Sequence, residues 1–144
     1  MSDAAQQLAE RCVAKLLADD AYTAWLGAEL REIAPGRCVL EMTVRREMTN
    51  GFGICHGGVT FAFADSALAF ACNTRGFVTV AVDLSISYPS PAHTGDRLTA
   101  VGQELSGGAR LSFYDVTVTN QKQQTVALFR ATVYATREEH FPHE

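Results

Sequence analysis

The sequence predicts an α+β fold in which a six-stranded antiparallel sheet wraps around one long central helix. A chain of 144 residues, 47% of them hydrophobic and 19% charged, fits a single domain, 1–144, that buries its own core. The apolar segment 59–72 is too short to span a membrane and is expected as a helix inside the protein. Strand-like segments precede and follow it, which indicates a sheet around a buried helix.

The N-terminal segment is expected to be helical. In 3–20, strong helix formers are interspersed with Leu8, Cys12 and Leu16, a spacing that places these side chains on one face of an amphipathic helix. Residues 21–27 are expected to continue as a helical turn or a loop that ends at Gly27. The helix therefore lies on the body of the protein with one face buried.

Two strands and a loop precede the central helix. The strands, 28–33 and 38–45, form a hairpin, because the sequence 34–36, Ala-Pro-Gly, is typical of a turn. In the second strand every other residue is apolar, so that one face seeks the core: Cys38, Leu40, Met42 and Val44. After the loop 47–56, the central helix is predicted at 57–74, with Gly76 as its stop signal.

Four further strands are predicted after the helix. The alternation in the first predicts that one apolar face meets the core: Val78, Val80, Val82, Leu84, Ile86 and Tyr88. Strands near 96–105, 110–119 and 124–136 follow. The sequences 107–108, Gly-Gly, and 120–124, which is polar, indicate hairpin turns between them.

Charge and cysteine usage exclude several functional classes. The net charge is −4 and the pI about 5.5, with one basic pair at 45–46, so no nucleic-acid partner is expected. Four widely spaced cysteines without a signal peptide indicate reduced thiols in a cytoplasmic protein. His140 and His143 lie in a polar tail that is expected to fray, and no metal site is expected.

Asp65 is the one ionisable side chain of the predicted central helix. An unpaired carboxylate in an apolar interior costs several kcal/mol, so it calls for a partner or a purpose. One explanation is that Asp65 faces solvent or pairs with an arginine such as Arg75 or Arg110. The other is that it acts on a substrate.

The start of this helix has the properties of an oxyanion-binding site. Gly57 and Gly58 lack β-carbons, so a ligand can approach the unsatisfied N–H groups of the first turn. These groups could stabilise a carbonyl oxygen that gains negative charge in acyl transfer. The alternative is that the glycines only permit a tight turn.

Helix geometry places the two candidate groups far apart. Gly57 and Asp65 are separated by eight residues, roughly 12 Å along a helix axis. A reacting carbonyl must lie about 3 Å from both its donors and the attacking group. If both residues act, they must come from different subunits, with two equivalent sites in a two-fold dimer.

The loop before the helix contributes three further candidates. Asn50 could bind a water molecule or the substrate carbonyl, or it could stabilise the turn with Gly51. His56 could support the loop or touch the ligand, and structural support is favoured because no second base is required. A Cys55–His56 nucleophile is not favoured, since adjacent side chains rarely face each other.

Several segments together resemble one known family. The sequence 50–58, NGFGICHGG, followed by 63–67, FADSA, resembles the hotdog thioesterase superfamily, and most closely its phenylacetic acid degradation (PaaI-type) branch. The resemblance continues through 71–73, 86–88, 95–96 and 125–130 and covers roughly 25–135. It implies a hotdog fold, dimers paired through their sheets, and commonly a tetramer of two dimers.

The resemblance also implies an activity, the hydrolysis of acyl-CoA thioesters, often with an aryl-acetyl acyl group. Asp65 would be the general base or nucleophile, the Gly57 N–H would polarise the thioester carbonyl, and Asn50 and His56 would complete the pocket across the dimer. CoA would be part of substrate and product, so no separate cofactor is expected.

One position departs from the family pattern. Relatives often carry a basic residue after the Ile-Ser-Tyr sequence to meet the CoA phosphates, but this chain has Pro-Ser-Pro at 89–91. Attention therefore moves to Arg110, Arg75 or Arg97. Further candidate contacts to substrate or CoA are Gly58, Ser66 and Ser90.

Two alternative functions are compatible with the same fold. An acyl-thioester dehydratase or hydratase generally needs a histidine opposite the acid, and a non-catalytic protein could bind acyl-CoA as a sensor. Phe52, Phe61 and Phe63 could line an acyl pocket but are more typical of a core.

Overall fold

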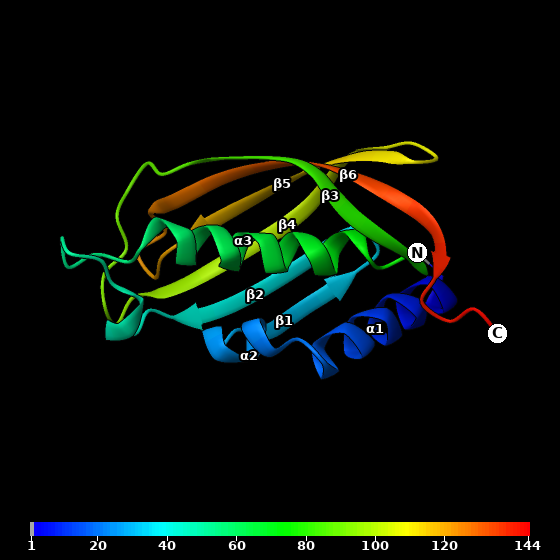
Figure 1. Ribbon diagram of the computed structural model, residues 1–144, viewed down its shortest axis with the longest axis horizontal. Coiled ribbons are helices and arrows are strands. Elements are labelled where there is room, and N and C mark those ends of the chain that lie inside the picture. The colour runs from blue at the N-terminus through cyan, green and yellow to red at the C-terminus, as the bar shows by residue number, and fades with distance from the viewer. Residues whose placement is uncertain (1) are drawn as a thin grey trace.

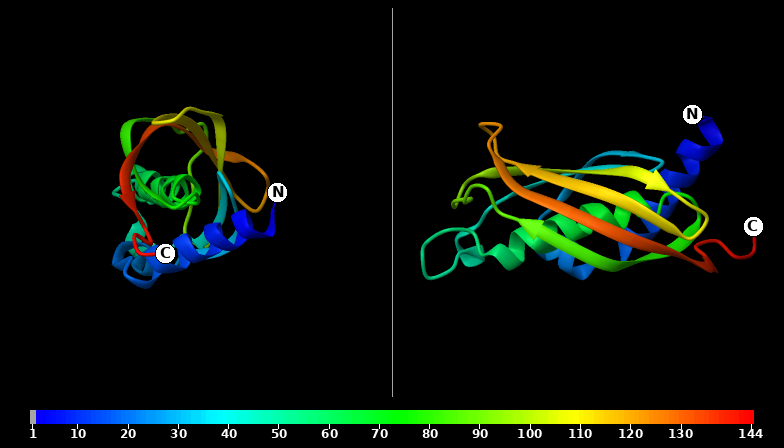
Figure 2. Two further views of the ribbon diagram at one scale, coloured as in Figure 1. Left: turned by 90° about the vertical axis from the view of Figure 1, so that its right-hand side faces the viewer. Right: turned by 90° about the horizontal axis from the view of Figure 1, so that it is seen from above.

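The computed structural model describes residues 2–144 and confirms the α+β architecture, with a curved sheet around a central helix (Figures 1 and 2). In chain order the elements are α1 (Asp3–Ala18), α2 (Ala21–Leu26), β1 (Glu29–Ala34), β2 (Arg37–Thr43), the 3-10 helix η1 (Arg46–Met48), α3 (Gly57–Cys72), β3 (Phe77–Ser87), β4 (Arg97–Gly107), β5 (Leu111–Thr119) and β6 (Thr125–Glu139). No helix within residues 2–144 is long and apolar enough to cross a membrane.

The six strands form one antiparallel sheet in the order β1-β2-β4-β5-β6-β3. β1 and β3 are therefore its edges. The β1 edge lies against α1, where the Gln6 side-chain amide donates a 2.7 Å hydrogen bond to the Ile33 carbonyl oxygen. β3 pairs with β6 along one side, and its other side meets no strand within residues 2–144.

α3 packs into the concave side of the sheet because nearly all of its surface is apolar. Phe63 and Ala67 are fully buried, and the predicted inner face of β2 is buried as well. Gly102 of β4 allows the sheet to approach the helix closely, since a Cβ there would lie 3.2 Å from the Ala67 carbonyl oxygen. The sheet thus holds α3 at a fixed depth and orientation.

The helix ends earlier than the sequence predicts, at Cys72 rather than at 74. Asn73 ends it, because the Asn73 side-chain amide donates to the Ala69 carbonyl oxygen at 2.8 Å and the Asn73 N–H donates to the Phe70 carbonyl oxygen at 3.3 Å. Gly76 has a φ of +94° but lies in the turn beyond the cap. Gly76 thus supports the turn, whereas Asn73 ends the helix.

The predicted inner face of β3 is wrong in its first half. Val80 is 46% exposed and Val82 is 57% exposed, whereas Leu84 and Ile86 pack against the core. The pairing with β6 shifts between Ala81 and Asp83, which breaks the alternation. At this point of the edge strand β3, no part of the described chain covers either face of the strand.

The prediction that the C-terminal tail frays is also wrong for its first residues. His140 is only 4% exposed, and its N–H donates a 2.8 Å hydrogen bond to the Gly76 carbonyl oxygen. The Arg11 guanidinium lies 4.3 Å from the centre of the Phe141 ring. The polar composition of the tail predicts fraying, but His140 bonds to the turn before β3 and the Phe141 ring packs against α1.

Candidate active site

The first turn of α3 has one unsatisfied backbone donor. The His56 side chain caps the helix, since its Nδ1 accepts a 2.8 Å hydrogen bond from the Gly58 N–H. The Val59 and Thr60 N–H groups donate to the His56 carbonyl oxygen at 2.9 and 3.3 Å. Within residues 2–144 the structure assigns no acceptor to the Gly57 N–H. This N–H therefore remains free to bind a ligand at the positive end of the helix.

Tyr88 holds this turn in place, a contact that sequence reasoning missed. The Tyr88 hydroxyl donates a 2.8 Å hydrogen bond to the Gly57 carbonyl oxygen. A Cβ at position 57 would lie 3.3 Å from both Cζ and Oη of Tyr88. The β3 alternation assigned Tyr88 to the core, but the strand ends at Ser87 and the side chain reaches the helix start instead. Glycine at 57 is thus explained by the tyrosine against it.

A cavity of about 400 Å³ lies at the start of α3, with Gly57 in its lining. Its lining comes from the loop before α3, from α3 itself, from the segment after β3 and from β6: Asn50, Ile54, Cys55, Gly57, Thr60, Tyr88, Ser90, Pro91, Ala92 and Val126. Most of this lining is apolar, with a few polar groups, as in typical small-molecule sites.

Asn50 contributes both to this cavity and to its loop. Asn50 Oδ1 accepts hydrogen bonds from the Phe52 and Ile54 N–H groups at 3.0 and 3.4 Å, which confirms its role in the turn. Asn50 Nδ2 has no acceptor assigned to it among the described residues. The side chain is therefore oriented by its oxygen and offers its N–H groups to a ligand.

The cavity continues toward the surface of the protein. Ser90 and Pro91 also line a second, more polar cavity of about 260 Å³. The other residues around that second cavity are His93, Asp96, Asn120, Gln121, Lys122 and Gln124. A ligand anchored at Gly57 therefore has a route past Ser90 to solvent.

Asp65 is half-buried and has no hydrogen bond or ion pair assigned to it within residues 2–144. Burial raises the pKa of its carboxyl group above the ordinary value of an aspartate. The arginine partners considered from the sequence are engaged elsewhere: Arg75 with Glu104, and Arg110 with the Ala135 carbonyl oxygen at 3.3 Å. The carboxylate is thus desolvated without a structural partner, as is common for catalytic acids and bases.

One chain does not bring Asp65 to the cavity at Gly57, because Asp65 is not among the residues that line it. Both residues belong to the same regular helix, whose geometry sets their axial separation at roughly 12 Å.

Other predicted contacts have local roles in the fold. The Ser66 hydroxyl lies 2.9 Å from the Thr23 hydroxyl, and this contact ties α3 to α2. The Thr23 hydroxyl also donates to Asp20 Oδ2 at 2.7 Å. The Gly58 N–H is taken by His56. Arg97 forms an ion pair with Glu41. Arg110 lies in the turn between β4 and β5, and in Figure 1 this turn is at the opposite end of the molecule from the first turn of α3.

The Cys55–His56 pair does not form a nucleophile. The Cys55 thiol is buried, its Sγ lies 3.6 Å from the Thr60 hydroxyl, and burial raises its pKa. The His56 ring nitrogen Nδ1 accepts from Gly58 instead. A protonated thiol turned away from the base is a poor nucleophile.

The three phenylalanines of the sequence analysis lie in different environments. Phe63 is fully buried in the core, and Phe61 packs edge-to-face on Phe129 with ring centres 5.4 Å apart. Phe52 is 90% exposed in the loop before α3. None of the three lines the cavity at Gly57.

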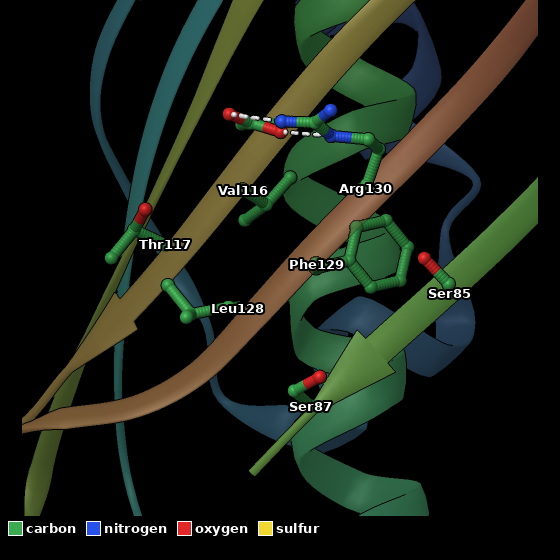
Figure 3. A pocket seen from close by; sticks show the side chains of 8 residues that line it. Ser85, Ser87, Val116, Thr117, Leu128, Phe129 and Arg130 are labelled. Carbon is green, nitrogen blue, oxygen red and sulfur yellow. Dashed lines mark hydrogen bonds and ion pairs between the residues drawn. The ribbon is translucent and has the colours of Figure 1, made fainter. Parts of the chain in front are cut away.

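A further cavity, of about 430 Å³, lies on the outer surface of the sheet, with α3 behind it (Figure 3). Ser85, Ser87, Thr117 and Leu128 lie around it, and Arg130 forms an ion pair with Asp115 at its rim, with Arg130 Nε 2.9 Å from Asp115 Oδ1. Neither Gly57 nor Asp65 lines it, so this cavity is separate from the candidate active site.

The chain is similar to proteins of one known family. The model of the thioesterase superfamily matches residues 52–127, the segment that contains the helix start and Asp65. Acyl-coenzyme A thioesterase PaaI of Escherichia coli is 42% identical over 112 residues, 78% of this chain and 80% of that protein. This chain belongs to the thioesterase superfamily.

Solved structures of other thioesterases share its fold. The structure of the Escherichia coli PaaI protein from the phenylacetic acid degradation operon matches with a TM-score of 0.91 and 36% identity, over 93% of this chain and 97% of that one. A hypothetical thioesterase protein of Streptococcus pneumoniae, solved with coenzyme A, matches with a TM-score of 0.81 and 26% identity, over 87% and 98%. The expected hotdog fold and PaaI-type resemblance are confirmed.

Proposed function

We propose that this thioesterase hydrolyses acyl-CoA to free CoA and a carboxylic acid, with each active site shared between two subunits. The observation that carries the proposal is the pair of unsatisfied groups on α3, the Gly57 N–H beside a cavity and the unpaired Asp65 carboxylate. CoA is part of substrate and product, so the reaction needs no separate cofactor.

In this mechanism the Gly57 N–H of one subunit binds the thioester carbonyl oxygen and stabilises its negative charge in the transition state. Asn50 Nδ2 is a second donor to the same oxygen. Asp65 of the other subunit either attacks the carbonyl carbon, giving an anhydride that water then cleaves, or removes a proton from an attacking water. The C–S bond breaks, and the departing thiolate takes up a proton.

The raised pKa of Asp65 favours this role, because a less solvated carboxylate is a stronger base. His56 and Tyr88 keep the first turn of α3 rigid through its Gly58 N–H and its Gly57 carbonyl oxygen. A dehydratase would need a histidine facing the substrate, and the capping role of His56 favours hydrolysis over that alternative.

The CoA arm is proposed to leave Gly57 past Ser90 and to run along the polar cavity beyond it. His93 and Lys122 line that cavity and provide hydrogen-bonding and cationic groups for phosphates. Arg110, in contrast, belongs to the turn between β4 and β5 and lines neither the cavity at Gly57 nor the polar cavity beyond it.

The proposed dimer forms through β3. Its free edge can pair with β3 of a second copy, and the exposed Val80 and Val82 become covered in the process. Further exposed apolar side chains support a tetramer of two such dimers: Leu105, Leu111, Phe113, Leu128 and Tyr134. Light scattering coupled to size-exclusion chromatography measures the molar mass and so distinguishes the dimer from the tetramer.

An aryl-acetyl acyl group is the proposed natural substrate, since the Escherichia coli relative comes from the phenylacetic acid degradation operon. The four cysteines are free, as the reduced state expected for a cytoplasmic location requires. Release of CoA from phenylacetyl-CoA tests the substrate directly. Binding of the ester without CoA release would identify a sensor instead of an enzyme.

The shared site is tested by subunit mixing. Asp65→Asn and Gly57→Pro each inactivate both sites of a homodimer, but a mixed dimer keeps one site with both groups intact. Random exchange of subunits between equal amounts of the two variants should restore about a quarter of wild-type activity. Half of the dimers are then mixed, and each mixed dimer has one working site out of two. If the mixture stays as inactive as its components after confirmed exchange, the site is not shared.

A further inference from the structure

A fourth cavity, of about 600 Å³, lies beside the C-terminal half of α3. Leu16, Asp19 and Asp20 form its wall at the junction of α1 and α2, and Ala69 and Phe70 of α3 and Val78 of β3 face them. The cavity thus lies on the open side of the rolled sheet, between β3 and the N-terminal helices (Figure 2).

The cavity begins one helical turn beyond Asp65. Residues four apart lie above one another on a helix, so Asp65, Ala69 and Asn73 form one stripe along α3. Both Ala69 and Asn73 line the cavity. Asp65 itself is not among the residues that line the cavity, and the small side chain of Ala69, one turn beyond it, leaves space in the cavity that a larger side chain would fill.

Asn73 and His140 close the far end. Asn73 Oδ1 accepts from His140 Nε2 and from the Thr79 N–H, both at 2.9 Å, while Asn73 Nδ2 donates to the Thr79 carbonyl oxygen at 3.0 Å. The Lys15 ammonium donates to the His140 carbonyl oxygen. These contacts fix the side chains that end the cavity.

The two cavities along α3 differ in what they can hold. The cavity at Gly57 leads past Ser90 to a polar surface with a lysine, as a long phosphorylated arm requires. The cavity beyond Asp65 ends at the buried side chains of Asn73 and His140 and has apolar wall residues such as Leu16, Phe70 and Val78. It also carries two carboxylates against one ammonium, which disfavours phosphates.

We infer that the cavity between α1, α3 and β3 is the acyl pocket of the enzyme, closed by the Asn73–His140 pair. The inference rests on the proposed hydrolysis at Asp65 and adds its substrate class. The distance from Asp65 to Asn73 is roughly 12 Å along the helix axis, and an extended chain advances roughly 1.2 Å per bond. The pocket therefore accepts acyl groups of about six to ten carbons, straight or with one aromatic ring.

His140 and the wall residues on α1 and α2 are specificity-determining residues that come from the two ends of the chain. α1, α2 and His140 lie outside the segment 52–127 that matches the superfamily model, whereas Asp65 and Gly57 lie within it. The chemistry is therefore supplied by the matched segment, and the chain ends set the depth of the pocket.

Ala69→Leu tests the pocket, with Ala14→Leu as its control. Both add the same side chain to a helix, but Ala14 is exposed and lines neither of the two cavities along α3 nor the polar cavity beyond Ser90. We expect Ala69→Leu to lower kcat/KM for octanoyl-CoA and phenylacetyl-CoA at least about tenfold, with acetyl-CoA changed less than about threefold. Ala14→Leu should leave all three values unchanged. His140→Ala should raise the rate on dodecanoyl-CoA relative to octanoyl-CoA.

The outcomes separate this inference from the proposed function. Equal losses on all esters with Ala69→Leu, or no loss on any, would overturn the acyl pocket while wild-type turnover still supports hydrolysis. If the wild type releases CoA from none of the esters, the proposed function itself fails. Circular dichroism melting of each variant shows whether a loss of rate reflects unfolding.

Discussion

Replacement of Gly57 by proline removes a single hydrogen-bond donor and is the sharpest probe of the proposed oxyanion site. Gly57 is the first residue of α3, the helix position that tolerates proline best, because its N–H has no partner within the helix. The preceding His56 has φ −59° and ψ 132°, an extended conformation compatible with a following proline. The substitution should therefore leave the helix intact.

Gly57→Ala is the matched control, because it keeps the N–H. Either substitution places a Cβ about 3.3 Å from the Tyr88 ring, so both variants share this crowding. Overpacking of this kind costs about 1 to 3 kcal/mol, and the ring can move by a few tenths of an ångström into the adjoining cavity. The difference between the two variants isolates the donor.

Loss of one oxyanion donor lowers kcat by about 10² to 10³ in enzymes that depend on it. We expect Gly57→Pro to fall below Gly57→Ala by this factor, measured as thiol release at saturating acyl-CoA. The melting temperatures of the two variants should agree closely. If the proline variant is folded and its kcat matches that of the alanine variant, the Gly57 N–H is not the oxyanion donor.

Two further substitutions follow from the same site. Asp65→Asn should abolish activity and raise the melting temperature at pH 7. Burial raises the pKa of Asp65, so the folded protein favours the neutral carboxyl group. The stability that the neutral group contributes is lost as pH rises through the raised pKa. The two proteins should be equally stable below the unfolded-state pKa of aspartate, and a lower melting temperature at pH 7 would show that Asp65 is a stabilising ion. His56→Ala should cost about 0.5 to 2 kcal/mol in chemical denaturation because the helix cap is lost, whereas His56→Asn should keep the cap and most of kcat. A kcat that collapses equally in both variants would instead make the imidazole catalytic.

From the sequence alone, the helices and strands and the candidate site residues could be predicted. An apolar helix is recognisable from composition, and alternation identifies strands whose one face is buried, as in the segment 38–45. Asp65 stood out because a charge in such a helix is costly, and Gly57 because it begins the helix. The eight-residue spacing was enough to predict that one chain does not join them.

The environment of each side chain depends on how distant parts of the chain pack together. Tyr88 and His140 carry no local signal, because their partners Gly57 and Asn73 lie more than twenty residues away in the chain. The exposure of Val80 and Val82 depends on the position of β3 at the sheet edge, which strand alternation does not encode. Local patterns depend on neighbours in the chain, whereas caps, cavities and edges depend on neighbours in space.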